Sequence, residues 1–383
     1  MNLLALESAQ PGAGNSTLAN PRLEALTTLR FFAALHVVIF HLQVEGILTG
    51  GTWWYRNLAG IGYAGVDFFF VLSGFILVYT YGGPALDSRR FWQARFARIY
   101  PAYLVSLVVA APFFFQAVQT NYIPFFAWSQ HHLAWACILT LTLLQSWNPQ
   151  AALAWNPVCW SLSVEAFFYS FFPLLLGWTK RVSRGRLVVA IAACCGISFA
   201  ISLAYLLVHP DGLAKVNSGE TTLLWKNILS FNPLIRLPEF VAGMLTARLF
   251  LTAGTNRRFA SALVGVGVVG LAVIVLCAAR IPSSLMSPGL FAPLYAAIFY
   301  GLALRPRWAS LLEMKGLVLL GNASYSLYLL HSIVISSVFA AASFLPFWPR
   351  VASAVIAGLA ASILSYFVVE SPARRLLHPR KAM

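Results

Sequence analysis

Charged residues are scarce in this sequence. Only 10% of its 383 residues are Asp, Glu, Lys or Arg, whereas 60% are hydrophobic. Soluble globular domains carry roughly 25% charged residues, so the composition excludes an ordinary soluble protein. Runs of about 20 apolar residues, the length a helix needs to cross a membrane, recur along the chain between short polar connections. The regular alternation of apolar and polar residues that a membrane β-barrel requires is missing. The sequence therefore predicts an all-α, polytopic membrane protein.

Acidic residues are especially few. The chain has 11 Asp and Glu against 26 Lys and Arg, a formal net charge of +15. In a soluble domain this excess would suggest a nucleic-acid partner. Here the cations are confined to the short connections between apolar segments, a pattern typical of membrane topology. We therefore expect the lipid bilayer, and no nucleic acid, as a partner.

Cysteine is also rare, and its spacing fits no metal site. The five cysteines form no CxxC pair, and no histidine is placed to complete a metal-binding set, so no metal is expected. The amino-terminal segment lacks the basic start of a signal peptide. We expect residues 1–25 to be a flexible cytoplasmic tail, 26–372 the membrane domain, and 373–383 a basic cytoplasmic tail.

Eleven segments are candidates for membrane helices, and one of them is too short to cross. Residues 133–146 number only fourteen, below the roughly 17 that a crossing needs, which favours a re-entrant element. The eleven segments span residues 27–44, 61–81, 101–118, 133–146, 160–178, 187–208, 233–251, 259–279, 286–304, 318–343 and 352–369.

The distribution of cations supports ten crossings. Clusters of Lys and Arg occur at residues 89–98, 180–186, 257–258, 305–315 and 374–381. All of them face the cytoplasm only if the short segment does not cross. The prediction is therefore ten transmembrane helices, one short re-entrant segment, and both termini in the cytoplasm.

The first span carries ionisable groups, which are costly inside a membrane and so point to function. Arg30 and His41 are eleven residues apart, which places them within about 20° of one helix face and about 16.5 Å apart along its axis. They share a stripe without touching. His36 lies on another face, where a structural role with a local partner is expected. Alternatively, the Arg30 side chain extends to the lipid headgroups, and His41 is a buried histidine that only forms a hydrogen bond with a neighbour.

Two carboxylates are predicted near the depth of His41. Asp67 lies near the outer end of the second span, and Glu165 lies in the outer half of the span that begins at Trp160. Either carboxylate is suited to orient a histidine and to stabilise its imidazolium form. Arg236 and Glu239 are spaced i, i+3, for which an ion pair is the simpler interpretation.

A basic segment precedes the third span. Arg95 and Arg98 lie among aromatic residues, which indicates either an interfacial helix on anionic lipid or a rim that binds the phosphates of a nucleotide-like donor. Guanidinium groups match phosphate oxygens in a bidentate fashion. Both interpretations place this segment at the cytoplasmic surface.

Taken in order, several sequence blocks resemble the acyltransferase-3 family of membrane-bound O-acyltransferases. Arg30 and His41 match that family's R-x10-H pattern, and GVDFFFVLSGF, RFARIYP, WSLSVEAFFY, NPLIRLPEF, NASYSLYLLH and VVESP match later blocks. The resemblance covers residues 26–372. It implies a ten-span enzyme of the bacterial inner membrane that moves an acyl group, commonly acetyl from acetyl-CoA, to a sugar hydroxyl of a cell-surface glycan or lipid-linked precursor.

The resemblance also implies site residues. His41 and Arg30 are the expected catalytic pair, supported by Asp67 or Glu165. The expected substrate-binding residues lie in the matched blocks: Arg95, Arg98, Tyr100, Trp160, Ser161, Arg236, Glu239, Ser324, Tyr325 and His331. No permanently bound cofactor is expected, because acetyl-CoA or another acyl-CoA acts as donor substrate.

The hypothesis for the mechanism is that Arg30 holds the donor while His41 removes the proton from the acceptor hydroxyl. Direct attack on the thioester and an acyl-histidine intermediate both remain open. The sequence has no G-x-S-x-G serine elbow, which disfavours a serine route. The alternative function is a transporter of glycan precursors or acyl groups, although the inverted repeats of many transporters are not found.

Overall fold

The computed structural model describes residues 22–83, 86–120, 123–212, 221–253 and 257–377. Within these residues the chain forms helices and no strand, which confirms the predicted all-α class. The predicted tails lie largely outside the described residues, at 1–21 and 378–383. The start of the predicted carboxyl-terminal tail is instead part of a short helix, α16 (Ser371–Leu376).

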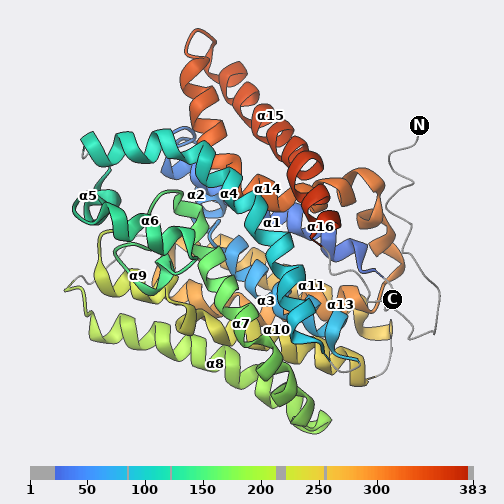
Figure 1. Ribbon diagram of the computed structural model, residues 1–383. Coiled ribbons are helices and arrows are strands. Elements are labelled where there is room, and N and C mark those ends of the chain that lie inside the picture. The colour runs from blue at the N-terminus through green and yellow to red at the C-terminus, as the bar shows by residue number, and fades with distance from the viewer. Residues whose placement is uncertain (1–21, 84–85, 121–122, 213–220, 254–256, 378–383) are drawn as a thin grey trace.

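Ten of the described helices run between two ends of a bundle (Figure 1). They match ten of the eleven predicted segments, in order. Their bounds are α1 (Glu24–Val44), α3 (Ala64–Tyr81), α4 (Ser88–Thr120), α7 (Trp160–Arg181), α8 (Arg184–Val208), α10 (Pro233–Ala253), α11 (Ala260–Cys277), α13 (Ala292–Ala303), α14 (Lys315–Ala341) and α15 (Phe347–Ser365).

The eleventh predicted segment is a short helix. It forms α6 (Leu133–Leu141), which has nine residues and is followed by turns and a 3-10 turn at Gln145–Trp147. Nine residues cover about 13.5 Å, less than half of a bilayer core. The other short helices described are α2 (Trp53–Gly60), α5 (Ala127–His131), α9 (Leu224–Phe231) and α12 (Ser283–Leu285).

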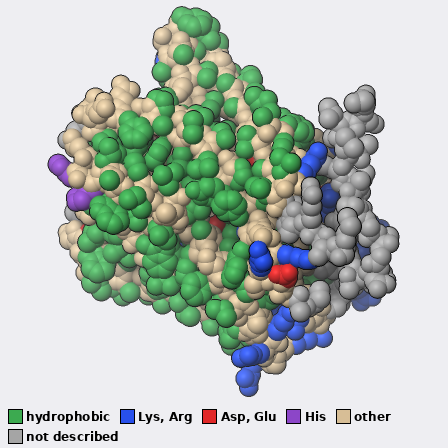
Figure 2. Space-filling model, in the orientation of Figure 1, with side chains coloured by type: hydrophobic (Ala, Val, Ile, Leu, Met, Phe, Trp, Pro, Cys, Tyr) green, Lys and Arg blue, Asp and Glu red, His purple; other side chains and the backbone are tan. Residues whose placement is uncertain are grey.

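The basic connections lie together at one end of the bundle. Lys180 Nζ donates to the carbonyl of Gly83, 3.3 Å away, next to the start of α4. Arg184 donates to the carbonyl of Ala253 at 3.1 Å, and Trp308 donates to the hydroxyl of Ser261 at 3.0 Å. On the face drawn in Figure 2, Lys and Arg gather at one end and hydrophobic side chains cover the broad middle. We call this the basic end, and the other the opposite end.

This arrangement confirms that the short segment does not cross. Because the connection after α7 lies at the same end as the start of α4, the chain between the two helices leaves and returns on the opposite side. Nine helical segments of the described chain are long and apolar enough to span a membrane. The helix α10 has a similar length but contains Arg236, Glu239 and Arg248.

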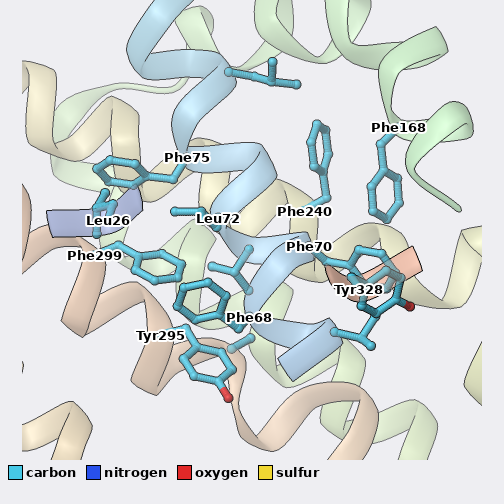
Figure 3. Packing of buried hydrophobic residues seen from close by; sticks show 14 of the residues in the cluster. Leu26, Phe68, Phe70, Leu72, Phe75, Phe168, Phe240, Tyr295, Phe299 and Tyr328 are labelled. Carbon is cyan, nitrogen blue, oxygen red and sulfur yellow. The ribbon is translucent and has the colours of Figure 1, made fainter. Parts of the chain in front are cut away.

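The charged helix α10 lies in the interior, where it crosses α3 closely. A Cβ atom added at Gly74 of α3 would collide with the carbonyl oxygen of Phe240, and one at Gly243 of α10 with that of Val71. Figure 3 shows the aromatic side chains packed around this crossing, including Phe70, which has no solvent exposure. The close backbone contact fixes α3 and α10 relative to each other.

Candidate active site

One cavity lies toward the basic end and is rich in arginine. It has a volume of about 260 Å³ and is bordered by helices α1, α3, α4, α7, α14 and α16. Four guanidinium groups line it, and we therefore call it the arginine cavity. They belong to Arg30, Arg95, Arg98 and Arg374.

The arginine cavity carries an excess of positive charge. Glu165 is the carboxylate that lines it, and Tyr169 donates a hydrogen bond to this carboxylate. Arg374 is partly neutralised by Glu370, 2.7 Å away. The remaining guanidinium groups are well suited to an anionic ligand with several phosphate oxygens, because such contacts are charge-assisted and bidentate.

A second cavity lies toward the opposite end. Its volume is about 240 Å³, and its lining includes His41, Tyr63, Trp160, Lys226 and Arg236. We call it the histidine cavity. Its walls combine aromatic rings with a few polar groups, the composition typical of a small-molecule site. Arg30 and His41 share helix α1, as predicted, but each lines a different cavity.

His41 contacts a second histidine from α14. Its Nδ1 atom lies 3.1 Å from Nε2 of His331 and 2.9 Å from the carbonyl of Val37. Nδ1 of His331 lies 2.8 Å from the carbonyl of Tyr328, which requires a proton on that nitrogen. His331 Nε2 is then an acceptor and His41 Nδ1 a donor. This assignment, made from the partners, leaves Nε2 of His41 unprotonated and able to accept a proton.

Asp67 does not contact His41, so the predicted contact is wrong. Arg236 donates to Asp67 in a buried ion pair, and Ser287 donates to the same carboxylate oxygen at 2.9 Å. Glu239 lies 3.2 Å from the same guanidinium, which confirms the predicted i, i+3 pair. A fully buried carboxylate needs a fixed cation, because desolvation is costly without one, and a buried guanidinium meets this need.

Glu165 is not next to His41 either, since it lines the arginine cavity, where the charges of Arg98, Arg30 and Arg95 act on it. The carboxylate whose charge acts on His41 is Glu45, one turn further along α1. Ser332 donates to Glu45 at 2.5 Å, and Ser336 donates to its other oxygen. Glu45 is not among the site residues predicted from the sequence, although its i, i+4 spacing from His41 is visible there.

Other predicted binding residues divide between cavity walls and structural contacts. Tyr325 lines the arginine cavity and donates to the carbonyl of Ile99 at 2.9 Å. Tyr100 donates to the carbonyl of Leu141 at 2.9 Å, and Ser324 donates within its own helix to Gly321 at 2.7 Å. Neither residue is part of the described cavity linings. The ring of His36 contacts the carbonyl of Leu58 at 2.7 Å, the local partner that was predicted.

The two cavities meet at two shared residues. Val66 of α3 and Tyr328 of α14 line both of them. The Tyr328 hydroxyl lies 2.8 Å from the carbonyl of Val158 and 2.7 Å from Ser161 Oγ. Tyr328 is not among the residues predicted from the sequence. Its spacing of three residues from both Tyr325 and His331 makes it a neighbour of each on the surface of α14.

Comparison with known proteins places this site in a family. The family model described as an acyltransferase domain matches residues 23–368. The chain belongs to this acyltransferase family. It is therefore an enzyme, a multi-pass membrane-bound O-acyltransferase, as the resemblance implied. No solved structure matches the chain.

Named relatives agree with this assignment. Acyltransferase MdmB of Streptomyces mycarofaciens is 30% identical, and the alignment covers 94% of each chain. O-acetyltransferase OatA of Staphylococcus aureus is 26% identical over 93% of this chain and 58% of its own length. The Bacillus subtilis protein YrhL, which carries the provisional name peptidoglycan O-acetyltransferase, is 29% identical over 91% of this chain and 54% of its own. The chain thus spans little more than half of OatA and YrhL.

Proposed function

We propose that this enzyme transfers an acetyl group from cytoplasmic acetyl-CoA to a sugar hydroxyl of a cell-surface glycan or a lipid-linked precursor. The observation that carries the proposal is the pair of cavities that meet at Val66 and Tyr328, one lined by arginines and one containing His41. The names of OatA and YrhL, both of which contain the term O-acetyltransferase, support acetyl as the acyl group.

The arginine cavity is the proposed donor site. Acetyl-CoA carries several phosphate groups, and guanidinium groups bind phosphate oxygens in pairs. Arg95, Arg98 and Arg374 lie toward the basic end of the bundle and are suited to hold these phosphates. Arg30 lies in the same cavity on the helix that carries His41, and it is proposed to hold the polar body of the donor. The positive-inside rule supports a cytoplasmic basic end. We propose that both termini are also cytoplasmic and that the membrane is a bacterial inner membrane.

The histidine cavity is the proposed acceptor site. A sugar bound there would present a hydroxyl to Nε2 of His41, which accepts its proton as a general base. The hydroxyl oxygen forms a bond to the thioester carbonyl carbon, the carbon–sulfur bond breaks, and the departing thiolate receives the proton from His41. Free CoA and the new ester are the products. His331 accepts a hydrogen bond from His41 Nδ1 throughout and so holds the imidazolium in place.

The test compares cells that lack the gene with cells complemented by the wild type or by His41→Ala, matched for protein in the membrane. Inverted membrane vesicles from each strain receive radiolabelled acetyl-CoA, and alkali-labile acetate in the envelope fraction is counted. The expected result is label in the wild type only, because a general base typically contributes about 10²–10⁴-fold to the rate. Full labelling with His41→Ala would overturn the assignment of the base, and no label with the wild type would overturn the proposed donor reaction.

A further inference from the structure

We call the boundary that the two cavities share at Val66 and Tyr328 the junction, and the small side chain of Val66 forms one side of it. Val66 and Tyr328 are both about 5% exposed and line both cavities. If the donor lies in the arginine cavity and the acceptor in the histidine cavity, the acyl group must lie at this junction when the ester forms. The following inference rests on that proposed function.

Tyr328 is a fixed wall. Its hydroxyl is held by the carbonyl of Val158 and by Ser161. Its ring packs at a steep angle against Phe69, with the centroids 6.0 Å apart. Because its hydroxyl is hydrogen-bonded and its ring is packed against Phe69, the Tyr328 side chain does not rotate to make room for a larger acyl group.

Helix α3, which carries Val66, is fixed as well. Just before Val66, Tyr295 donates to the carbonyl of Ala64 at 3.0 Å. Just after it, Asp67 forms the buried ion pair with Arg236. Gly65 packs against the backbone of α1 at Ala33. With contacts on both sides, α3 has no room to withdraw from the junction.

Val66 is itself stiff, because its β-branched side chain has one strongly preferred rotamer in a helix. We propose that Val66 sets the acyl-chain length, admitting acetyl at the junction and excluding longer acyl groups. One methylene in a hydrophobic pocket changes discrimination by roughly 10–200-fold. Loss of the two Val66 methyl groups should therefore open space for propionyl and butyryl groups.

The experiment is an internal competition that does not require a purified acceptor. Inverted vesicles receive an equimolar mixture of acetyl-CoA, propionyl-CoA and butyryl-CoA, and the acids released from the envelope fraction by mild alkali are separated and quantified. We expect Val66→Ala to raise the propionyl-to-acetyl ratio by about 10-fold over the wild type. Val66→Leu should lower the same ratio.

The matched control is Val71→Ala, on the same helix. Val71 is fully buried and is absent from the lining of both cavities, so this substitution weakens packing without widening the junction. Equal ratios in Val66→Ala and Val71→Ala, with acetyl transfer intact, would overturn the role of Val66. A wild type that incorporates none of the three acids would instead overturn the proposed function, so the two failures are distinguishable.

Discussion

Single residues in this enzyme acquire their roles from partners far away in the sequence. His41 is held by His331, which is 290 positions further along the chain, and the partner of Asp67 is 169 positions away. The histidine pair gives His41 a neutral neighbour that accepts from Nδ1, while the charge of Glu45 acts from one turn away. The proposed base is therefore oriented by the hydrogen bond that it donates to a neutral imidazole.

This arrangement predicts the effect of removing the His331 acceptor. His331→Phe keeps an aromatic ring but cannot accept from His41 Nδ1, so the ring of His41 is held only by Val37. We expect kcat to fall by about 10-fold or more, though by less than the roughly 10²–10⁴-fold loss for removal of a base. The KM for acetyl-CoA should not change, because His331 lies outside the arginine cavity lining. Initial rates in vesicles measure both constants.

A structural role for His331 would give another result. In that case kcat and the amount of folded protein would fall together, as thermal unfolding in detergent would reveal. An unchanged kcat in a fully folded His331→Phe protein would show that the contact between the two histidines does not contribute to the rate.

At the level of helices, the crossing of α3 and α10 depends on two glycines. Their missing side chains allow backbone atoms of the two helices to touch at Val71 and Phe240. The same crossing brings Asp67 and Arg236 together and places Val66 at the cavity junction. Gly62 and Gly65 allow a similarly close approach to the backbone of α1, at His36 and Ala33.

Gly243→Ala should therefore destabilise the protein. The added methyl group meets the backbone carbonyl of Val71, which cannot rotate away, so the helices must separate. Overpacking of this kind typically costs about 1–3 kcal/mol. The check is the melting temperature of the purified protein in detergent, where a clear decrease is expected.

Gly177→Ala on α7 is the matched control. No atom lies near the position of its added Cβ, and alanine is a better helix former than glycine by about 1 kcal/mol. Its melting temperature should equal or slightly exceed that of the wild type. A Gly243→Ala protein as stable as Gly177→Ala would contradict a tight crossing.

Considered as a whole, the molecule separates charge from apolar surface. Basic side chains gather at one end of the face drawn in Figure 2. Exposed apolar side chains such as Val189 of α8 and Val266 of α11 lie along the sides of the bundle. An apolar side surface suits the lipid bilayer, and a basic end suits the cytoplasmic face. In this proposed orientation, the arginine cavity lies on the side where acetyl-CoA, the proposed donor, is available.

This orientation predicts the accessibility of single cysteines placed in a chain whose native cysteines are changed to alanine. Phe344→Cys and Gln150→Cys lie at the opposite end and should react with a membrane-impermeant maleimide in intact cells. Arg186→Cys and Leu376→Cys lie at the basic end and should react only after permeabilisation. Because all four wild-type side chains are exposed, burial does not limit the reaction. Labelling of Arg186→Cys and Leu376→Cys on opposite sides would contradict the ten-crossing topology.

Much of this organisation follows from the sequence alone. The apolar segments, the short element at residues 133–146, the common side of the basic connections and the stripe shared by Arg30 and His41 all depend on local periodicity, length and charge. These properties do not require knowledge of which helices are neighbours. The sequence motifs also identify the protein family. The family model that matches residues 23–368 shows that the chain belongs to it.

Only the tertiary structure decided which polar groups meet. Either Asp67 or Glu165 was expected to support His41, yet Asp67 is paired with Arg236 and Glu165 lines the arginine cavity. A buried charge is stabilised by the nearest fixed opposite charge, and the identity of that neighbour depends on helix packing. The same packing brings Val66 and Tyr328, from helices α3 and α14, to the junction of two cavities. Residues 262 positions apart are placed there by the fold, and the sequence has no local signature of it.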